Sequence, residues 1–186
     1  MAKEGIGMKV DNRIFDEYFL PIADKFKRND TDIQEIVIHG TGGGQSAQAI
    51  LDWMYSGERE DEYRRGIGLF HLEIDLTGEV FSVIPALYWC YHSSSGKHDK
   101  ETIGIELVNP IAQNEGGYTK DQYSSLIEVI DKIILRYPIK RIVGHGYNKQ
   151  TYSGSYKNCP GQAFEWSRLQ QHFKLKKIQH EAYETI

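Results

Sequence analysis

The segment "IQEIVIHGTGGGQ", residues 33–45, runs from an apolar stretch through His39 into a series of glycines. A short apolar run bounded by turn residues predicts a buried strand, and the glycines predict a tight turn into the next element. A strand, a glycine-rich turn and a helix in this order can bind phosphate on backbone N–H groups. A histidine at the end of a buried strand can instead hold a metal ion. These interpretations predict unrelated proteins, and the rest of the sequence has to distinguish them.

Three further segments predict strands. Residues 69–84, "LFHLEIDLTGEVFSVI", predict two short strands joined by a Thr-Gly turn. Residues 102–110, "TIGIELVNP", predict a buried strand that stops at Asn-Pro. Residues 141–146, "RIVGHG", predict a short strand that ends in His145, in the same strand-then-glycine context as His39.

Helical patterns separate these strands. The clearest begins at Thr119 and Gln122, which form a capping box, and its apolar residues recur at helical spacing until Pro138. Further amphipathic or helical patterns cover residues 12–28, 46–57 and 162–179. Strands that alternate with helices predict an α/β fold, namely a single domain with a mixed central β-sheet flanked by helices.

Composition excludes several classes of protein. The chain has 186 residues, of which 40% are hydrophobic and 26% are charged, so one domain with a substantial core is expected. The net charge of -4 argues against a general nucleic-acid binder. No stretch reaches the roughly 18 apolar residues that predict a membrane span, so no membrane insertion is expected. The N-terminal "MAKEGIGMKVDNR" has no apolar core typical of a signal peptide, which predicts synthesis in the cytoplasm without Sec-type export.

The glycine-rich turn does not match a phosphate-binding motif. "GTGGGQSAQ" has no Lys followed by Ser or Thr, and it completes only part of a dinucleotide fingerprint. The metal interpretation needs other ligands, and His145 and Cys159, in "YKNCPG", are candidates. Two histidines and one cysteine can bind zinc and leave its fourth position open for water. Each of these residues alone could also be an ordinary packed side chain. Competing ligands are His71, His92, His98, His172 and His180.

The sequence resembles the type-2 family of zinc-dependent N-acetylmuramoyl-L-alanine amidases, which includes amidase-type phage lysozymes and peptidoglycan recognition proteins. Five segments match in the family's order and together span roughly residues 33–170: "IVIHGTG", "LFHLEIDLTGEVFSVI", "YHSSSGKHDKETIGIELVN", "RIVGHG" and "KNCPGQAFEWSRL". The resemblance implies the family's mixed sheet flanked by helices. It also implies a zinc ion bound by His39, His145 and Cys159, although some relatives have Asp at the last position.

The resemblance implies the remaining site residues as well. Family members use as general base either a Tyr just before the His of the "FH" strand or a Glu in the "IGIEL" strand. This sequence has Phe70 and Glu106 at these places, so Glu106 is the expected base and Phe70 is expected to contact substrate. Lys157 matches a family Lys that stabilises the oxyanion, and His92 matches a family His that lines the substrate cleft. A cysteine ligand together with a glutamate base differs from either branch of the family taken whole.

We therefore expect a peptidoglycan hydrolase that cleaves the amide between the lactyl group of N-acetylmuramic acid and L-alanine. The alternative is a recognition module that binds peptidoglycan or muropeptide without cleaving it. An N-terminal extension (1–30), a zinc amidase domain (31–175) and a C-terminal tail (176–186) are expected, acting as a monomer. The biological setting stays open between a phage or prophage endolysin that reaches the cell wall on release and a cytoplasmic enzyme that recycles muropeptides.

Overall fold

The computed structural model describes residues 24–43, 46–47, 49, 70–179 and 181–184. Most of the two segments expected to be amphipathic or helical near the N-terminus, 12–28 and 46–57, lies outside these residues. Within the described part, no helix is both long and apolar enough to cross a membrane.

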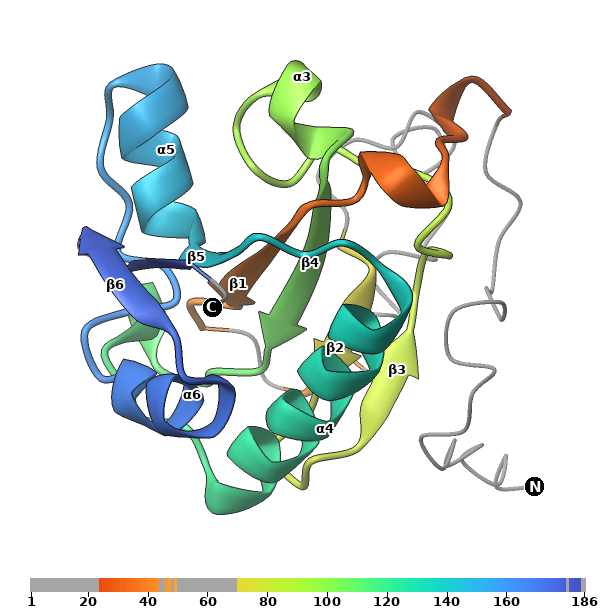
Figure 1. Ribbon diagram of the computed structural model, residues 1–186. Coiled ribbons are helices and arrows are strands. Elements are labelled where there is room, and N and C mark those ends of the chain that lie inside the picture. Colours follow the sequence, from red (N-terminus) through yellow and green to blue (C-terminus); the bar gives the residue numbers. More distant parts are fainter. Residues whose placement is uncertain (1–23, 44–45, 48, 50–69, 180, 185–186) are drawn as a thin grey trace.

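The fold is a mixed sheet with helices on both faces, as expected (Figure 1). In the described residues the sheet has seven strands in the order β3-β2-β4-β1-β5-β7-β6. Strand β1 is parallel to β4 and β5, and β4 is parallel to β2, whereas β3, β7 and β6 are added antiparallel. The strands are β1 Glu35–Gly40, β2 Leu72–Ile74, β3 Val80–Ser82, β4 Thr102–Leu107, β5 Arg141–Gly144, β6 Lys176–Gln179 and β7 Ala182–Glu184.

The described residues also form four α-helices and three 3-10 helices, and two of the 3-10 helices precede β1. The α-helices are α3 Gly96–Asp99, α4 Lys120–Arg136, α5 His145–Ser153 and α6 Trp166–Phe173. The 3-10 helices are η1 Asp24–Phe26, η2 Asp30–Asp32 and η3 Ala112–Asn114. The predicted capping box at the start of α4 is confirmed, since Gln122 N–H donates to Thr119 Oγ1 and Thr119 N–H donates to Gln122 Oε1, both over 3.0 Å.

The main core lies between the sheet and α4. Alternate residues of a strand point to opposite faces, and one face of the central strands is entirely aliphatic. It packs on the buried stripe of α4 and on α6, which lies beside α4 (Figure 1). The members in the central strands and α4 are Ile36, Ile38, Ile103, Ile105, Leu107, Tyr123, Leu126, Ile130 and Ile133.

The opposite face carries fewer apolar residues and most of the polar ones. Val37, Val143 and Ala182 pack there against Tyr147 of α5. Because alternation continues to the ends of the strands, His39 and Glu106 also project from this face. The face that α4 leaves free is therefore the one on which a polar site can form.

The C-terminal region differs from the sequence prediction. The helix expected over residues 162–179 spans only Trp166–Phe173 and ends at Lys174, whose backbone is left-handed with φ 52°. The chain then forms β6, and β7 pairs with β5. Residues 176–186, expected as a tail, thus contain two strands of the sheet. The apolar spacing of this segment fits both a helix and an edge strand, and strand pairing decides between them, since β6 pairs with β7 and β7 with β5.

The α4 core supports a stability prediction. Leu126 is completely buried against the sheet, whereas Leu135 on the same helix is 88% exposed. We expect Leu126→Ala to lower the free energy of unfolding by about 2–5 kcal/mol, because it leaves a cavity in the core. Leu135→Ala should change it by less than about 0.5 kcal/mol. Urea unfolding followed by circular dichroism measures both, and equal effects would contradict this assignment of the core.

Candidate active site

Three strands bring the candidate residues to one end of the sheet. His39 lies near the end of β1 and is the register partner of Glu106 in β4. Ile38 pairs with Gly144 of β5, so His145 follows at the same level as the first residue of α5. Side chains at the carboxyl ends of adjacent parallel strands commonly form the site of an open α/β sheet.

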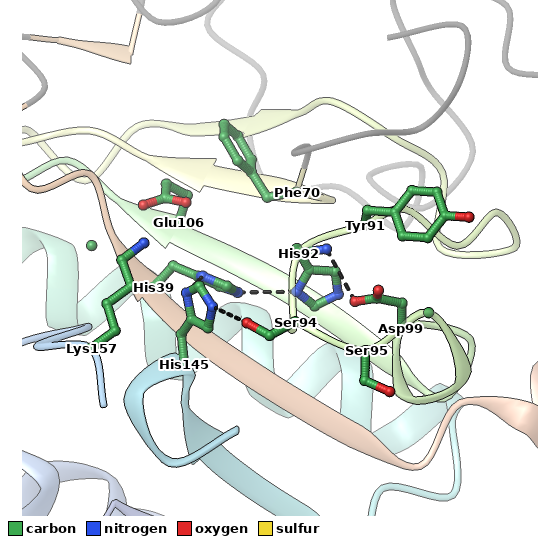
Figure 2. A pocket seen from close by; sticks show the side chains of 12 residues that line it. His39, Phe70, Tyr91, His92, Ser94, Ser95, Asp99, Glu106, His145 and Lys157 are labelled. Atoms are coloured by element: carbon green, nitrogen blue, oxygen red, sulfur yellow. Dashed lines mark hydrogen bonds between the residues drawn. The ribbon is translucent and has the colours of Figure 1, made fainter. Parts of the chain in front are cut away.

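These residues line a cleft of about 500 Å³ (Figure 2). Lys157 borders the cleft near Glu106, and Phe70 and His92 lie along its walls. Six of the seven predicted site residues are therefore lining residues; the seventh, Cys159, is completely buried. The lining residues also include some that the sequence did not single out, namely Gly40, Tyr91, Ser94, Ser95, Gly96 and Asp99.

His39, His145 and Cys159 form a group suited to a metal ion. One ligand atom from each lies within 4.8 Å of the others, and all three side chains are buried. The two Nδ1 atoms of the histidines are 3.1 Å apart. Zinc bonds of 2.0–2.1 Å in tetrahedral geometry place two nitrogen ligands roughly 3.3 Å apart, so this spacing fits a shared ion.

The protonation of these ligands also suits a cation. Burial lowers the pKa of His39 well below its usual value and that of His145 to about 3, which keeps both imidazoles neutral near pH 7. Burial raises the pKa of the Cys159 thiol to about 12, and the nearby Lys157 partly offsets this rise. A bound dication would favour the thiolate strongly enough to reverse the effect of burial.

The Nε2 atom of each of these two histidines lies within hydrogen-bond distance of a neutral side chain. His39 Nε2 lies 3.0 Å from His92 Nδ1, and His92 Nε2 lies 2.9 Å from Thr102 Oγ1. His145 Nε2 lies 3.1 Å from Ser94 Oγ (Figure 2). If Nδ1 of each ligand faces a metal, its Nε2–H donates to these partners, which fixes the tautomer and the orientation of the ring.

A second group of potential ligands consists of His71, Cys90 and His92. The Arg28 guanidinium lies against it, with Nη2 3.0 Å from His71 Nε2. Both ring nitrogens of His71 already have backbone partners, because Nδ1 accepts from Gly104 N–H and Nε2 lies 2.9 Å from the carbonyl oxygen of Tyr88. A neighbouring cation and occupied ring nitrogens disfavour a metal here, so the first group is the better candidate.

The described residues of the glycine-rich turn, 40–43, do not present their N–H groups to a ligand. Gly40 N–H donates to Cys159 Sγ over 3.4 Å, and Thr41 N–H donates to a backbone carbonyl of β4. Gly42 N–H donates to a side chain, Asn114 Oδ1, and Gly43 N–H to the carbonyl oxygen of Asn109. Phosphate binding would need these donors free. The turn instead holds the segment that carries Cys159.

Two carboxyl groups lie side by side on the polar face. Glu106 is half-buried in the cleft, and burial raises its pKa to about 7 while Lys157 lowers it. Its register partner in β2, Glu73, is completely buried, and neither of its oxygens has a hydrogen-bond partner among the described residues. Burial, followed by repulsion from Glu106, raises the pKa of Glu73 to about 9. Glu106 can therefore exchange a proton near neutral pH, whereas Glu73 stays neutral there.

The comparisons with known proteins agree with the sequence resemblance. Residues 29–162 match the family model described as N-acetylmuramoyl-L-alanine amidase. A search of curated proteins finds no match.

Three solved structures illustrate the similarity of fold. The N-acetylmuramoyl-L-alanine amidase LysC from Clostridium intestinale URNW has a TM-score of 0.61 and 22% identity, over 79% of this chain and 89% of that chain. AmiD from E. coli, in complex with the substrate anhydro-N-acetylmuramic acid-L-Ala-D-gamma-Glu-L-Lys, has a TM-score of 0.59 and 20% identity. The match covers 76% of this chain and 57% of that chain. The Ph2119 endolysin from Thermus scotoductus MAT2119 bacteriophage Ph2119 has a TM-score of 0.54 and 21% identity, over 78% and 87%.

The two candidate metal groups lead to a matched test with their cysteines. Cys159 and Cys90 are both buried, but only Cys159 belongs to the group with His39 and His145. We expect Cys159→Ala to lose most of its zinc, because only two protein donors remain, and Cys90→Ala to keep about one zinc per chain. Metal analysis of the purified proteins measures this content. Zinc lost from the Cys90 variant alone would assign the ion to the other group.

Glu73 leads to a prediction about stability and pH. Its pKa is raised from 4.5 to about 9, so the folded protein binds this proton more tightly than the unfolded chain does. The stability that Glu73 contributes is therefore present below about pH 4.5 and is lost as the pH rises towards 9. Glu73→Gln stays neutral at every pH, so its Tm should exceed that of the wild type by a growing margin from pH 4.5 to 9. A constant margin in thermal unfolding would show that Glu73 does not take up this proton on folding.

Proposed function

Because the chain belongs to the N-acetylmuramoyl-L-alanine amidase family, we propose that it is a zinc-dependent peptidoglycan hydrolase. The bond cleaved is the amide between the lactyl group of N-acetylmuramic acid and L-alanine. The observation that carries the proposal is that two imidazoles and a half-buried carboxyl group line one cleft, with a buried thiol close enough to the imidazoles to share a metal ion with them. A module that only binds muropeptide has no need of this combination.

His39, His145 and Cys159 would hold the zinc ion. Zinc, when bound, lowers the pKa of a water molecule towards about 7 and polarises a carbonyl group. His92 and Ser94 would orient the two imidazoles through the hydrogen bonds described above. Both ring nitrogens of His92 are then used within the protein, so this residue would contact substrate only through its ring face or edge.

Glu106 is the proposed general base. A carboxyl group with a pKa of about 7 is ionised often enough to accept a proton from the attacking water, and it can then protonate the leaving amine. Lys157 is exposed at the rim of the cleft, and its positive charge acts on Glu106, His39 and Cys159. Its ammonium group would stabilise the negative charge that develops on the carbonyl oxygen.

Phe70 contributes an apolar wall. It is buried together with Phe26, Val83 and Trp89, and it also lines the cleft. Its side chain has no proton to exchange, so it would contact substrate and exclude water from the neighbourhood of Glu106. Phe70, Glu106 and Lys157 would thus have different roles: Phe70 excludes water, Glu106 transfers the proton and Lys157 stabilises the oxyanion.

Product analysis is the direct test of the activity. Purified zinc-loaded protein is incubated with intact peptidoglycan and with a soluble muropeptide, and the products are identified by mass spectrometry. The proposal predicts peptides with a free L-alanine amino group and glycans with a free lactyl carboxyl group. Binding of muropeptide without either product would identify a recognition module instead, and cleavage at a different bond would refute the proposed reaction.

The role of Glu106 gives the kinetic prediction. Glu106→Gln keeps the size of the side chain but cannot accept a proton, so kcat should fall by about 10²–10⁴ while zinc content and fold are retained. Phe70→Tyr in this background should restore a small part of the activity, because it supplies the hydroxyl used in the other branch of the family. Phe70→Leu in the wild type should mainly affect packing, with activity remaining in the folded fraction.

Glu73→Gln is the matched control for Glu106→Gln. Both changes replace a carboxyl group by an amide at register-paired positions of adjacent strands, but Glu73 is not among the residues that line the cleft. Turnover of soluble muropeptide should therefore stay near the wild-type value in the Glu73 variant. Near-normal turnover by Glu106→Gln would overturn the assignment of the base.

A further inference from the structure

Asn114 lies where two segments of the site meet. It is the last residue of η3 and is 1% exposed. Its Oδ1 accepts a hydrogen bond of 2.7 Å from Gly42 N–H, and its Nδ2 donates over 3.0 Å to the carbonyl oxygen of Asn158. A single side chain thus joins the turn that follows His39 to the segment that precedes Cys159.

Two glycines that contact Asn114 have no room for a side chain. A Cβ atom added at Gly40 would lie 2.5 Å from Asn114 Oδ1, and one added at Gly161 would collide with the backbone carbonyl of Asn114. Asn114 itself has φ +58°, in the left-handed region that Asn tolerates better than most residues. The contact therefore depends on glycine at both neighbours and on a short polar side chain between them.

Two further hydrogen bonds support the same junction. Asn158 Nδ2 donates over 2.8 Å to the carbonyl oxygen of Gln113, and the hydroxyl of Tyr118 donates over 2.6 Å to that of Pro160. They fix the backbone of the Cys159 segment against the segment between β4 and α4. Neither reaches the glycine-rich turn. That turn also contacts the Cys159 segment through Gly40 N–H, which donates to Cys159 Sγ, and through the backbone of Gln113, whose N–H donates to the carbonyl oxygen of Gly42 over 3.3 Å. Asn114 is the residue whose side chain accepts from one segment and donates to the other.

We propose that Asn114 is a positioning residue that sets the distance of Cys159 and Lys157 from His39. Gly42 lies three residues after His39, and Asn158 lies between Lys157 and Cys159. A shift of either segment would move a metal ligand on one side only, and zinc sites tolerate only about 0.2 Å in ligand distances. This inference rests on the proposed function for its metal ligands, but it concerns a residue that touches neither substrate nor metal.

The test compares two glycine substitutions in adjacent residues. Asn114→Gly removes both side-chain hydrogen bonds while glycine accepts the positive φ without strain. Gln113→Gly is the matched control, because Gln113 has φ +57°, is exposed, and contributes only backbone atoms, which glycine keeps: its carbonyl oxygen accepts from Asn158 and its N–H donates to the carbonyl oxygen of Gly42. Zinc affinity is measured by competition with a chelator, and the cobalt(II)-substituted proteins are compared by their visible ligand-field spectra.

We expect Asn114→Gly to bind zinc about 10–100-fold more weakly, as for loss of other residues that orient metal ligands. Its cobalt spectrum should differ from that of the wild type, and kcat should fall more than KM rises. Asn114→Asp keeps the acceptor for Gly42 and loses the donor to Asn158. Its zinc affinity should therefore lie between that of Asn114→Gly and that of the wild type. Gln113→Gly should match the wild type in all three measurements. All are made well below the Tm of each variant, so that loss of fold does not contribute.

Two results would overturn the inference. One is wild-type zinc affinity and cobalt spectrum in Asn114→Gly; the other is an equal loss in both glycine variants, which would assign the effect to backbone flexibility. These metal-binding measurements do not depend on turnover. A wild-type protein that binds zinc but cleaves no muropeptide would refute the proposed reaction and leave the role of Asn114 to be judged separately.

Discussion

The parallel pairing of β1 with both β4 and β5 is the constraint on which the site depends. Adjacent strands in a sheet lie about 4.8 Å apart, so residues at the same level of three strands come within reach of one small ligand. His39 and Glu106 share a register position, and His145 follows β5 at the next level. The core enforces this register, because a slip of one residue would turn Ile36 and Ile38 away from α4 and His39 towards it.

Burial then gives the residues at this end of the sheet different electrostatic properties. It keeps the imidazoles of His39 and His145 neutral, raises the pKa of Cys159, and brings that of Glu106 to about 7. With the thiol and Glu106 both ionised, two negative charges would balance a zinc dication. The positive charge of Lys157 would then remain for an oxyanion, which is the charge that amide hydrolysis has to stabilise.

Local pattern was enough to predict the central part of the fold and less useful beyond it. A few residues were enough to predict β1 and β4 from their apolar runs and the start of α4 from its capping box. All three predictions are confirmed. The C-terminal strands join the sheet where β7 pairs with β5, and no local pattern encodes this pairing. Spacing alone left the metal ligands open, and the resemblance selected them. Asn114 gave no signal, because a lone Asn in a loop is an ordinary turn residue until its two partners are known.

The choice of Glu106 as base also follows from what the other lining residues do. Asp99, the other carboxylate among the described lining residues, uses Oδ1 to accept from the N–H groups of His92 and Ser93, which ties it to the backbone. Tyr91 points its hydroxyl away from His39 (Figure 2). The nitrogens of His92 have protein partners, and the side chain of Phe70 carries no proton to exchange. Within the described cleft, Glu106 is thus the carboxyl group that lies beside His39, a proposed metal ligand, and has no hydrogen-bond partner that competes for its oxygens. A cysteine ligand and a glutamate base are compatible in one site because the two residues come from different segments, Cys159 before α6 and Glu106 within β4.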